Sequence, residues 1–199
     1  MAEDRFGELG KFKSVFREGV RKNRFLIDFK YTGTFGLTPN YTSDLKWLVQ
    51  GSSLPGQKVN DIEVSWQGLK TSYAGDPETN VDWKCNFFND KEQRAYKYID
   101  AWLNLKANPA SNTRGLATDY QRKILVYQLN ENGDKMCAYV LHNAHPNDLP
   151  EGARDNEPTT SWEQMDVSFK YDFRTYIADA NDTDAINVAL KLSEFTYAK

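Results

Sequence analysis

The chain has 199 residues, of which 40% are hydrophobic and 14% aromatic, so it can bury one sizeable core. Its 25 lysines and arginines are outnumbered by 28 aspartates and glutamates, and the net charge of -3 leaves no basic surplus to hold a phosphate backbone. This balance argues against stable nucleic-acid binding. Met1–Phe12 contains no apolar stretch of signal-peptide or membrane-span length, so we expect a soluble protein made in the cytosol.

The first predicted element is an amphipathic helix or arm at the N-terminus. Its apolar side chains recur at helical spacing, and charged side chains occupy the positions between them. The apolar stripe consists of Phe6, Leu9, Phe12, Phe16 and Val20. Because another copy of the chain can cover such a stripe, residues 1–22 are interpreted as an arm that contributes to self-association.

From Arg24 the apolar period changes to two, which is the spacing of a strand with one buried face. Phe25, Ile27 and Phe29 show this alternation, and later runs rich in β-branched and aromatic residues continue it. Those later predicted strands are Asp44–Gly51, Asp61–Gln67, Leu69–Ala74, Val81–Phe88, Arg122–Leu129, Lys135–Asn143 and Trp162–Tyr171. Gly68 suits a tight hairpin or a bulge between two of them.

One helix is predicted inside this β pattern, over Asp90–Lys106, with Asn89-Asp90 as its cap. Its apolar stripe is Ala95, Tyr98, Ile99 and Trp102. At the other end, Ala185–Lys199 alternates like a strand but contains good helix formers, and we interpret it as an extended arm. The predicted fold is mainly β, an antiparallel β-sandwich or open barrel with one inserted helix at about 90–106. The β domain spans residues 23–175, and residues 176–199 form a C-terminal extension.

Two histidines give the sequence its most metal-like spacing. His142 and His145 form an HxxH pair, and Asp148 could supply a third ligand. A metal site of this kind needs both imidazoles on one face of a helix, whereas this segment leaves a predicted strand and meets Pro146. The sequence therefore favours a turn with exposed or half-buried imidazoles over a metal site.

Other signs of chemistry are also weak. No serine stands in a nucleophile-elbow context, and the glycines lack the spacing of a phosphate-binding loop. Cys85 and Cys137 have no metal-ligand spacing and are expected to be buried free thiols. The acidic run Asp179–Asp184 lacks the glycine and glutamate of a calcium loop. The sequence thus predicts no enzyme, no cofactor, no metal and no small-molecule substrate.

Several short motifs follow one another in a fixed order through the β domain. They are Ser14–Gly19 before the first strand, Ser52-Ser53-Leu54-Pro55-Gly56, Tyr73-Ala74-Gly75-Asp76 as a turn, Trp83–Phe87 with Asn89-Asp90, Ile99–Trp102, Val140–Pro146 and Trp162–Asp172. In this order they resemble the tail tube proteins of T4-like contractile bacteriophages over roughly residues 14–174.

The chain departs from that family's pattern at a corner after Val140. Asn143 stands where the family tends to have glycine, and asparagine is the other residue that visits the left-handed backbone region readily. His145 stands where the family prefers an aromatic residue before proline, so it is expected to fill an aromatic position. The stretch Asn104–Tyr120 is longer than in the family, and residues 175–199 extend past its usual end.

The resemblance implies a structural virion protein that assembles in the bacterial host cytoplasm. Hexameric rings with joined inner sheets would stack into a tube inside a sheath, with baseplate and tail-terminator proteins as further partners. Because the genome would pass along the lumen without tight binding, a subset of Asp and Glu is expected to face it. The expected contacts between subunits are Phe6, Leu9, Phe12, Phe16, Leu54, Pro55, Tyr73 and Gly75.

Three alternatives remain open. The first is a tube initiator, a baseplate ring or the tube of an injection machine with the same fold. The second is a monomeric β-sandwich that binds carbohydrate through exposed tryptophans such as Trp47 or Trp66. The weakest is a hydrolase built on paired acids such as Asp61 and Glu63.

Overall fold

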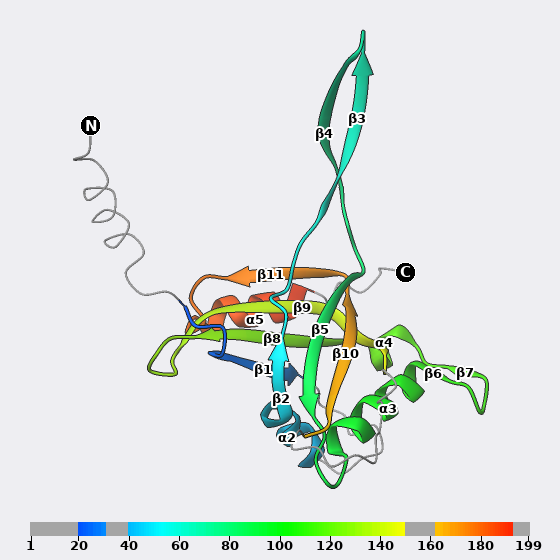
Figure 1. Cartoon of the computed structure of the whole chain (residues 1–199), viewed down its shortest axis with the longest axis vertical. Helices are drawn as coiled ribbons and strands as arrows, with labels where there is room; N and C mark the ends of the chain where they lie inside the picture. Colours follow the sequence, from blue (N-terminus) through cyan, green and yellow to red (C-terminus); the bar gives the residue numbers. More distant parts are fainter. Residues whose placement is uncertain (1–19, 31–39, 150–161, 193–199) are drawn as a thin grey trace.

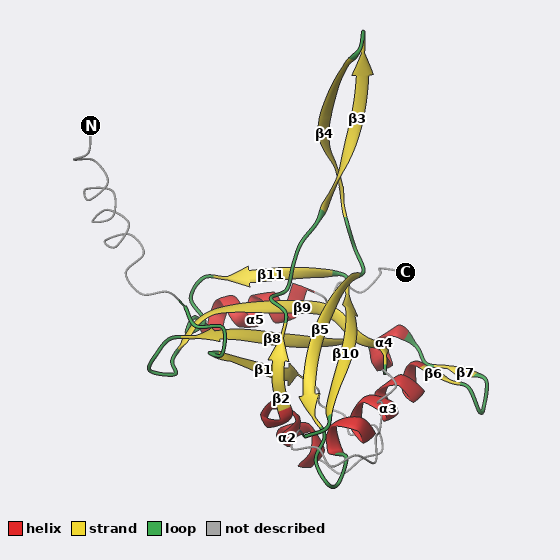
Figure 2. Cartoon of the chain, viewed as in Figure 1, coloured by secondary structure: helices red, strands yellow, loops and turns green. Residues whose placement is uncertain are grey.

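The computed structural model of the chain describes residues 20–30, 40–149 and 162–192. It is mainly β, as predicted, with antiparallel sheets and a smaller share of helix (Figure 2). Its elements, in chain order, are β1 (Phe25–Lys30), α2 (Asn40–Leu48), β2 (Val49–Ser52), β3 (Val59–Trp66), β4 (Leu69–Pro77), β5 (Val81–Phe88), α3 (Arg94–Lys106), β6 (Ala107–Asn108), β7 (Thr113–Arg114), α4 (Ala117–Tyr120), β8 (Arg122–Leu129), β9 (Lys135–Asp148), β10 (Gln164–Tyr171), β11 (Phe173–Ile177) and α5 (Thr183–Lys191).

The main sheet is antiparallel, with strand order β1-β8-β9-β10-β5-β2 and β11 paired to β9. The long strand β9 belongs to both halves of this sheet: its first part pairs with β8 and β11, and its last residues pair with β10. Figure 1 shows β1, β8, β9 and β11 running across the view while β2, β5 and β10 cross them. The sheet therefore bends into two layers that can enclose a core.

The bend is made at Asn143 of β9, whose φ of 56° lies in the left-handed region. The side-chain amide of Asn143 donates to the Asp172 carboxylate at 2.6 Å, and the Asp172 amide donates to the carbonyl oxygen of His142 at 3.1 Å. Asp172 is the residue between β10 and β11, so these bonds join both strands at the corner. The prediction that asparagine can serve this corner in place of glycine is confirmed.

The larger core lies between the two layers. Strict alternation in β5 and β10 places Trp83 opposite Phe169 and Cys85 opposite Val167, and all four side chains are buried. The rings of Trp83 and Phe169 lie 5.4 Å apart. Helix α3 closes this core with the stripe predicted from the sequence, whose members are buried: Ala95, Tyr98, Ile99 and Trp102.

A second, smaller core lies on the opposite face of β8 and β9, beneath α5. Leu125 and Val140 are fully buried there, and Ala189 of α5 packs with them. Strand β8 is consequently buried on both faces over four successive residues. The N-terminus of α5 is capped by Asp182, whose carboxylate accepts from the backbone amides of Asp184 and Ala185.

Three predictions about helices are wrong in detail. The segment predicted as the strand Asp44–Gly51 is mostly helix α2, because Leu45 and Leu48, three residues apart, both pack on the larger core. The C-terminal segment predicted as an extended arm contains α5, whose cap and packing surface override the alternation. The inserted helix α3 begins at Arg94, four residues after Asp90, and it is one of four described helices rather than the only one.

Candidate subunit interface on a projecting hairpin

Strands β3 and β4 pair with each other and with no other described strand. Figures 1 and 2 show this pair leaving the body as a long, twisted hairpin that continues β2 and β5. Every residue of β3 is exposed, and β4 is exposed throughout except at the half-buried Gly75. An isolated two-stranded hairpin is only marginally stable in water, so this one needs a covering surface.

The hairpin register separates its side chains by polarity. Ile62 pairs with Tyr73, Val64 with Thr71 and Trp66 with Leu69, which places these six side chains on one face. The alternate positions form the opposite face and are polar or small: Asp61, Glu63, Ser65, Lys70, Ser72 and Ala74. We call the first set the apolar face of the hairpin.

The apolar face is open to solvent in the single chain. Trp66 is 73% exposed and Leu69 is 77% exposed, at the end of the hairpin furthest from its root. The tip is a two-residue turn in which Gln67 has a φ of 48° and Gly68 a φ of 82°, the conformations that a tight hairpin turn requires. A contiguous exposed apolar surface of this kind marks an interface with another molecule.

Two of the predicted contact residues, Tyr73 and Gly75, lie on this hairpin. Tyr73 is exposed on the apolar face, opposite Ile62. The motif Tyr73-Ala74-Gly75-Asp76 was predicted to form a turn, but it lies within β4, where a bulge shifts the register against β3. Glycine is required in this strand because a Cβ at Gly75 would lie 2.7 Å from the carbonyl oxygen of Asn60.

The predicted contacts Leu54 and Pro55 lie at the root of the hairpin, in the segment between β2 and β3. Leu54 is exposed and Pro55 is buried. Two hydrogen bonds fix this segment to the larger core: Trp83 Nε1 donates to the Ser53 carbonyl oxygen, and the Tyr171 hydroxyl donates to that of Gly56, each at 2.7 Å. These bonds fix the root of the hairpin to the body. The other predicted contacts, Phe6, Leu9, Phe12 and Phe16, lie outside the described residues.

The histidine pair lies within β9 and not in a turn, so the prediction of a turn is wrong. His142 is fully buried rather than exposed or half-buried; it stacks on Phe173 at 4.2 Å, and its Nε2 lies 2.9 Å from the hydroxyl of Thr175. His145 makes an edge contact with the ring of Tyr120, as expected for an aromatic position. Across the residues that the structure describes, no group of three His, Cys, Asp or Glu side chains could hold a metal ion.

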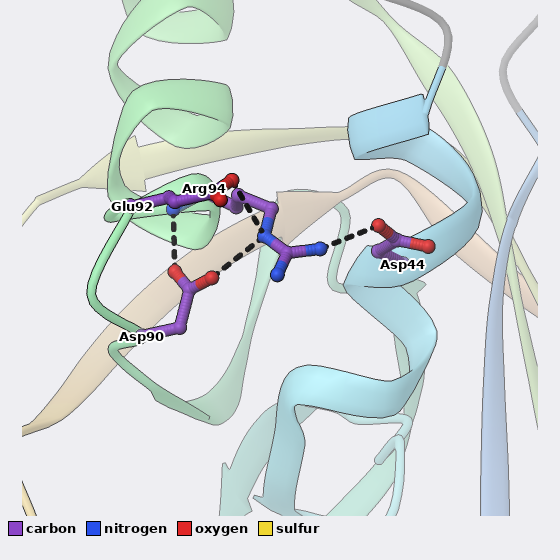
Figure 3. Close-up of polar contacts among 4 residues, drawn as sticks. All are labelled: Asp44, Asp90, Glu92 and Arg94. Atoms are coloured by element: carbon purple, nitrogen blue, oxygen red, sulfur yellow. Dashed lines mark hydrogen bonds and ion pairs between the residues drawn. The ribbon is translucent and has the colours of Figure 1, made fainter.

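A cluster of charges that the sequence analysis did not identify joins α2 to α3 (Figure 3). Arg94 donates to Asp90 at 2.6 Å and to Asp44 at 2.7 Å, and Glu92 lies 3.4 Å away. Burial alone would raise the pKa of Asp90, but the hydrogen bonds from Arg94 outweigh it and lower the pKa. The spacing of four residues between Asp90 and Arg94 was the available signal.

Predictions about the cysteines and the exposed tryptophans have different outcomes. Cys85 and Cys137 are buried free thiols, as predicted. The exposed tryptophans Trp47 and Trp66 lie on α2 and at the hairpin tip, at opposite ends of the molecule, so they do not form one ligand platform (Figure 1). Among the described residues, none of the helices is both long and apolar enough to cross a membrane.

Comparison with known proteins supplies a family and a fold. Residues 20–178 match the family model described as phage tail tube protein. Among solved structures, the tube-terminating cap of the anti-feeding prophage is 14% identical with a TM-score of 0.57, over 81% of this chain and 92% of that one. The PVC sheath-tube complex of an extracellular contractile injection system is also 14% identical with a TM-score of 0.57, over 83% of this chain and 97% of that one. None of the curated proteins matches.

Proposed function

Because the chain belongs to the phage tail tube protein family, which the model match over residues 20–178 shows, we propose that it is the repeating subunit of the inner tube of a contractile tail. It is a structural component of the tail and not an enzyme. In this proposal six copies form a ring, rings stack into a hollow tube, and the genome leaves along the lumen. The apolar face of the hairpin is the single observation that carries the proposal.

The hairpin supports self-assembly because its exposed side chains are of the apolar kind that proteins usually bury in their cores. The exposed apolar side chains of the hairpin would lower the solubility of a monomer, yet they follow one another along a single face. They are Ile62, Val64, Trp66, Leu69 and Tyr73. Burial of apolar surface contributes about 25 cal/mol per Å², so covering this face would stabilise both the hairpin and the assembly. A second copy of the chain is the partner that a tube requires.

The sheet edges support closure into a ring. Among the described strands, β1 pairs only with β8 and β11 only with β9, so the layer β1-β8-β9-β11 has an open strand at each side. An open edge carries unpaired backbone donors and acceptors, which a neighbouring copy can satisfy. If β1 of each copy joins β11 of the next around a ring, no edge of this layer stays exposed. Six copies is the number that the family resemblance implies.

The partners proposed for this chain are a tail sheath, a baseplate and a tail terminator. The similar structures include a sheath-tube complex and a sheath/tube terminator of the PVC injection system and the baseplate of the anti-feeding prophage. We propose that the β domain over residues 23–175 forms the tube wall, that residues 1–22 act as an arm between rings, and that some of its aspartates and glutamates face the lumen. A reconstructed tube with an inner wall of mainly Lys and Arg would contradict the last point.

A second candidate is a ring at the end of the tube, or the tube of an injection machine. It is favoured by the similarity to the anti-feeding prophage cap and to the PVC tube, since both share the fold. Copy number separates these roles, because the main tube subunit is among the most abundant proteins of a purified particle and a cap is present in a single ring.

The proposed function is tested with the full-length chain purified without partners. We expect rings or hollow tubes by negative-stain electron microscopy and a rise in scattered light with protein concentration. A monodisperse monomer at every concentration tried, by light scattering and sedimentation, would contradict the proposal.

A further inference from the structure

The layer formed by β2, β5 and β10 has one face in the larger core and a second face that points away from it. Alternation along β5 places Trp83, Cys85 and Phe87 in the core, so the residues between them point outward. The outward residues are exposed or half-buried, and all are polar except Phe88 at the end of β5. We call the polar ones the polar face of the body: Asp82, Lys84 and Asn86 of β5, and Gln164, Asp166, Ser168 and Lys170 of β10.

The charges of the polar face are balanced across its strands. Asp82 lies opposite Lys170, with its carboxylate 3.9 Å from the ammonium, and the side-chain amide of Asn86 donates to the carboxylate of Asp166. On β5 and β10 two aspartates thus stand against two lysines, and the exposed Asp148 of β9 adds one carboxylate beside them. The polar face therefore has no surplus of cations.

The opposite side of the body has a different character. There the outward face of β8 and β9 is apolar and buried beneath α5, as Leu125 and Val140 show. Helix α5 in turn exposes Val188 at 61%, and its C-cap Leu192 is 39% exposed. Interfaces between proteins have an apolar centre, so the α5 side suits contact with another protein. The polar face, by contrast, suits contact with water.

We propose that the polar face lines the lumen of the tube and that α5 faces outward. This inference rests on the proposed function and names the residues that the genome would pass. A wall two layers thick has only two outward faces, and one of them borders the lumen. DNA is held where cations are in surplus, and the polar face has no such surplus, so the genome would move past it without tight binding.

The test places one reactive cysteine on each side of the tube wall. Lys84→Cys lies on the polar face and Asn187→Cys on the exposed side of α5. The native thiols Cys85 and Cys137 are buried, so their background is low, and the wild type measures it. Tubes of each variant are treated with N-ethylmaleimide, a small reagent, and with maleimide carried on ferritin, a particle far wider than a DNA duplex.

In tubes we expect Lys84→Cys to react with N-ethylmaleimide but to lose its reaction with ferritin-maleimide, except at the open tube ends. Asn187→Cys should react with both reagents. In dilute, unassembled protein both cysteines should react with both reagents, which shows that the loss comes from assembly. Asp166→Cys, on the polar face in β10, repeats the measurement at a second position.

The outcomes separate this inference from the proposed function. Ferritin labelling of Lys84→Cys along the length of the tubes would put the polar face outside and overturn the inference, although the chain still forms a tube. The inference is also wrong if this cysteine reacts with neither reagent in tubes, or if Lys84→Cys and Asp166→Cys both stay folded but unassembled. In those cases the polar face is a contact between subunits. If the wild type forms neither rings nor tubes, the proposed function fails as well.

Discussion

The body and the hairpin of this molecule use the same kinds of residue in opposite ways. Trp83, in β5, is fully buried between the two layers of the main sheet, and its indole donates to Ser53. Trp66, in β3, is 73% exposed at the tip of a hairpin that no other described strand pairs with. The body therefore completes its own core, whereas no described strand of the chain pairs with the hairpin and its apolar face is exposed.

This difference teaches that an alternation of apolar and polar residues indicates which face is buried in the functional state of a protein. For a subunit, that state is the assembly. The pattern of Ile62, Val64 and Trp66 has the same period as that of Trp83, Cys85 and Phe87. In one case the partner layer belongs to the same chain, and in the other we infer that it belongs to a second copy. Mutations can test this division of roles.

The largest effect is expected from a charge on the apolar face of the hairpin. Val64→Asp should abolish tube formation, because a carboxylate would have to be buried in the subunit contact without a partner. Ser65→Asp is the matched control, since it introduces the same charge one residue further along β3 on the polar face. Both variants should remain folded by circular dichroism of dilute protein, and Ser65→Asp should still assemble. Equal assembly of the two in a pelleting assay would contradict the assignment of the faces.

The converse is expected in the body. Trp83→Ala should lower the free energy of unfolding of the unassembled chain by about 3–5 kcal/mol, because it leaves a cavity in the larger core between the two layers. Trp66→Ala should change that free energy by no more than about 0.5 kcal/mol while impairing assembly. Chemical denaturation of dilute protein measures both. A large loss of monomer stability in Trp66→Ala would show that the hairpin packs on its own chain.

A smaller effect is expected at the corner that lets the body close on itself. Asn143→Ala and Asn143→Gly both remove the hydrogen bond to Asp172. Only the alanine variant has a Cβ that disfavours the left-handed backbone at φ 56°. We expect the alanine variant to be less stable than the glycine variant by about 1 kcal/mol. Denaturation of the two variants side by side gives this difference, and equal stability would argue against a strained corner.

The last effect depends on pH, is absent at neutral pH, and should be confined to the body. Burial, together with the ammonium of Lys123, lowers the pKa of His142 from 6.5 to about 4, and Asp172 opposes this only in part. A histidine held neutral by the fold contributes stability fully above pH 6.5, and the contribution is lost as the pH falls from 6.5 toward about 4.

His142→Gln keeps a polar group near Thr175 but cannot be protonated, so its melting temperature should fall less than that of the wild type between pH 7 and pH 4. Scanning calorimetry at four or five pH values measures the two slopes. Parallel slopes would mean that His142 does not carry the acid sensitivity.

Much of the body could be predicted because its strands are rich in β-branched and aromatic residues. Val81–Phe88, which buries one face, and Arg122–Leu129, which is buried on both faces over four residues, were predicted with the bounds that the structure gives them. The helix stripe of Tyr98, Ile99 and Trp102 was equally readable. Helix α2 was not, because Leu45 and Leu48 are too few to establish a helical period against the flanking apolar residues of β2.

The candidate site could be predicted only in part. The motif around Tyr73 and Gly75 pointed to the hairpin, but alternation along β3 and β4 could not reveal that these strands leave the body. Nor could local patterns show that β5 pairs with β10, which brings Trp83 next to Phe169 although they are far apart in sequence. Pairing between distant strands is the information that local patterns lack.

The central claim is that the apolar face of the hairpin is buried between copies in the assembled tube. Amide hydrogen exchange of residues 59–77, compared between purified tubes and dilute monomer, tests it most directly. The account predicts that these amides exchange rapidly in the monomer and at least about a hundredfold more slowly in the tube, while those of β5 and β8 are slow in both. Equal and rapid exchange of residues 59–77 in the two states would contradict the claim.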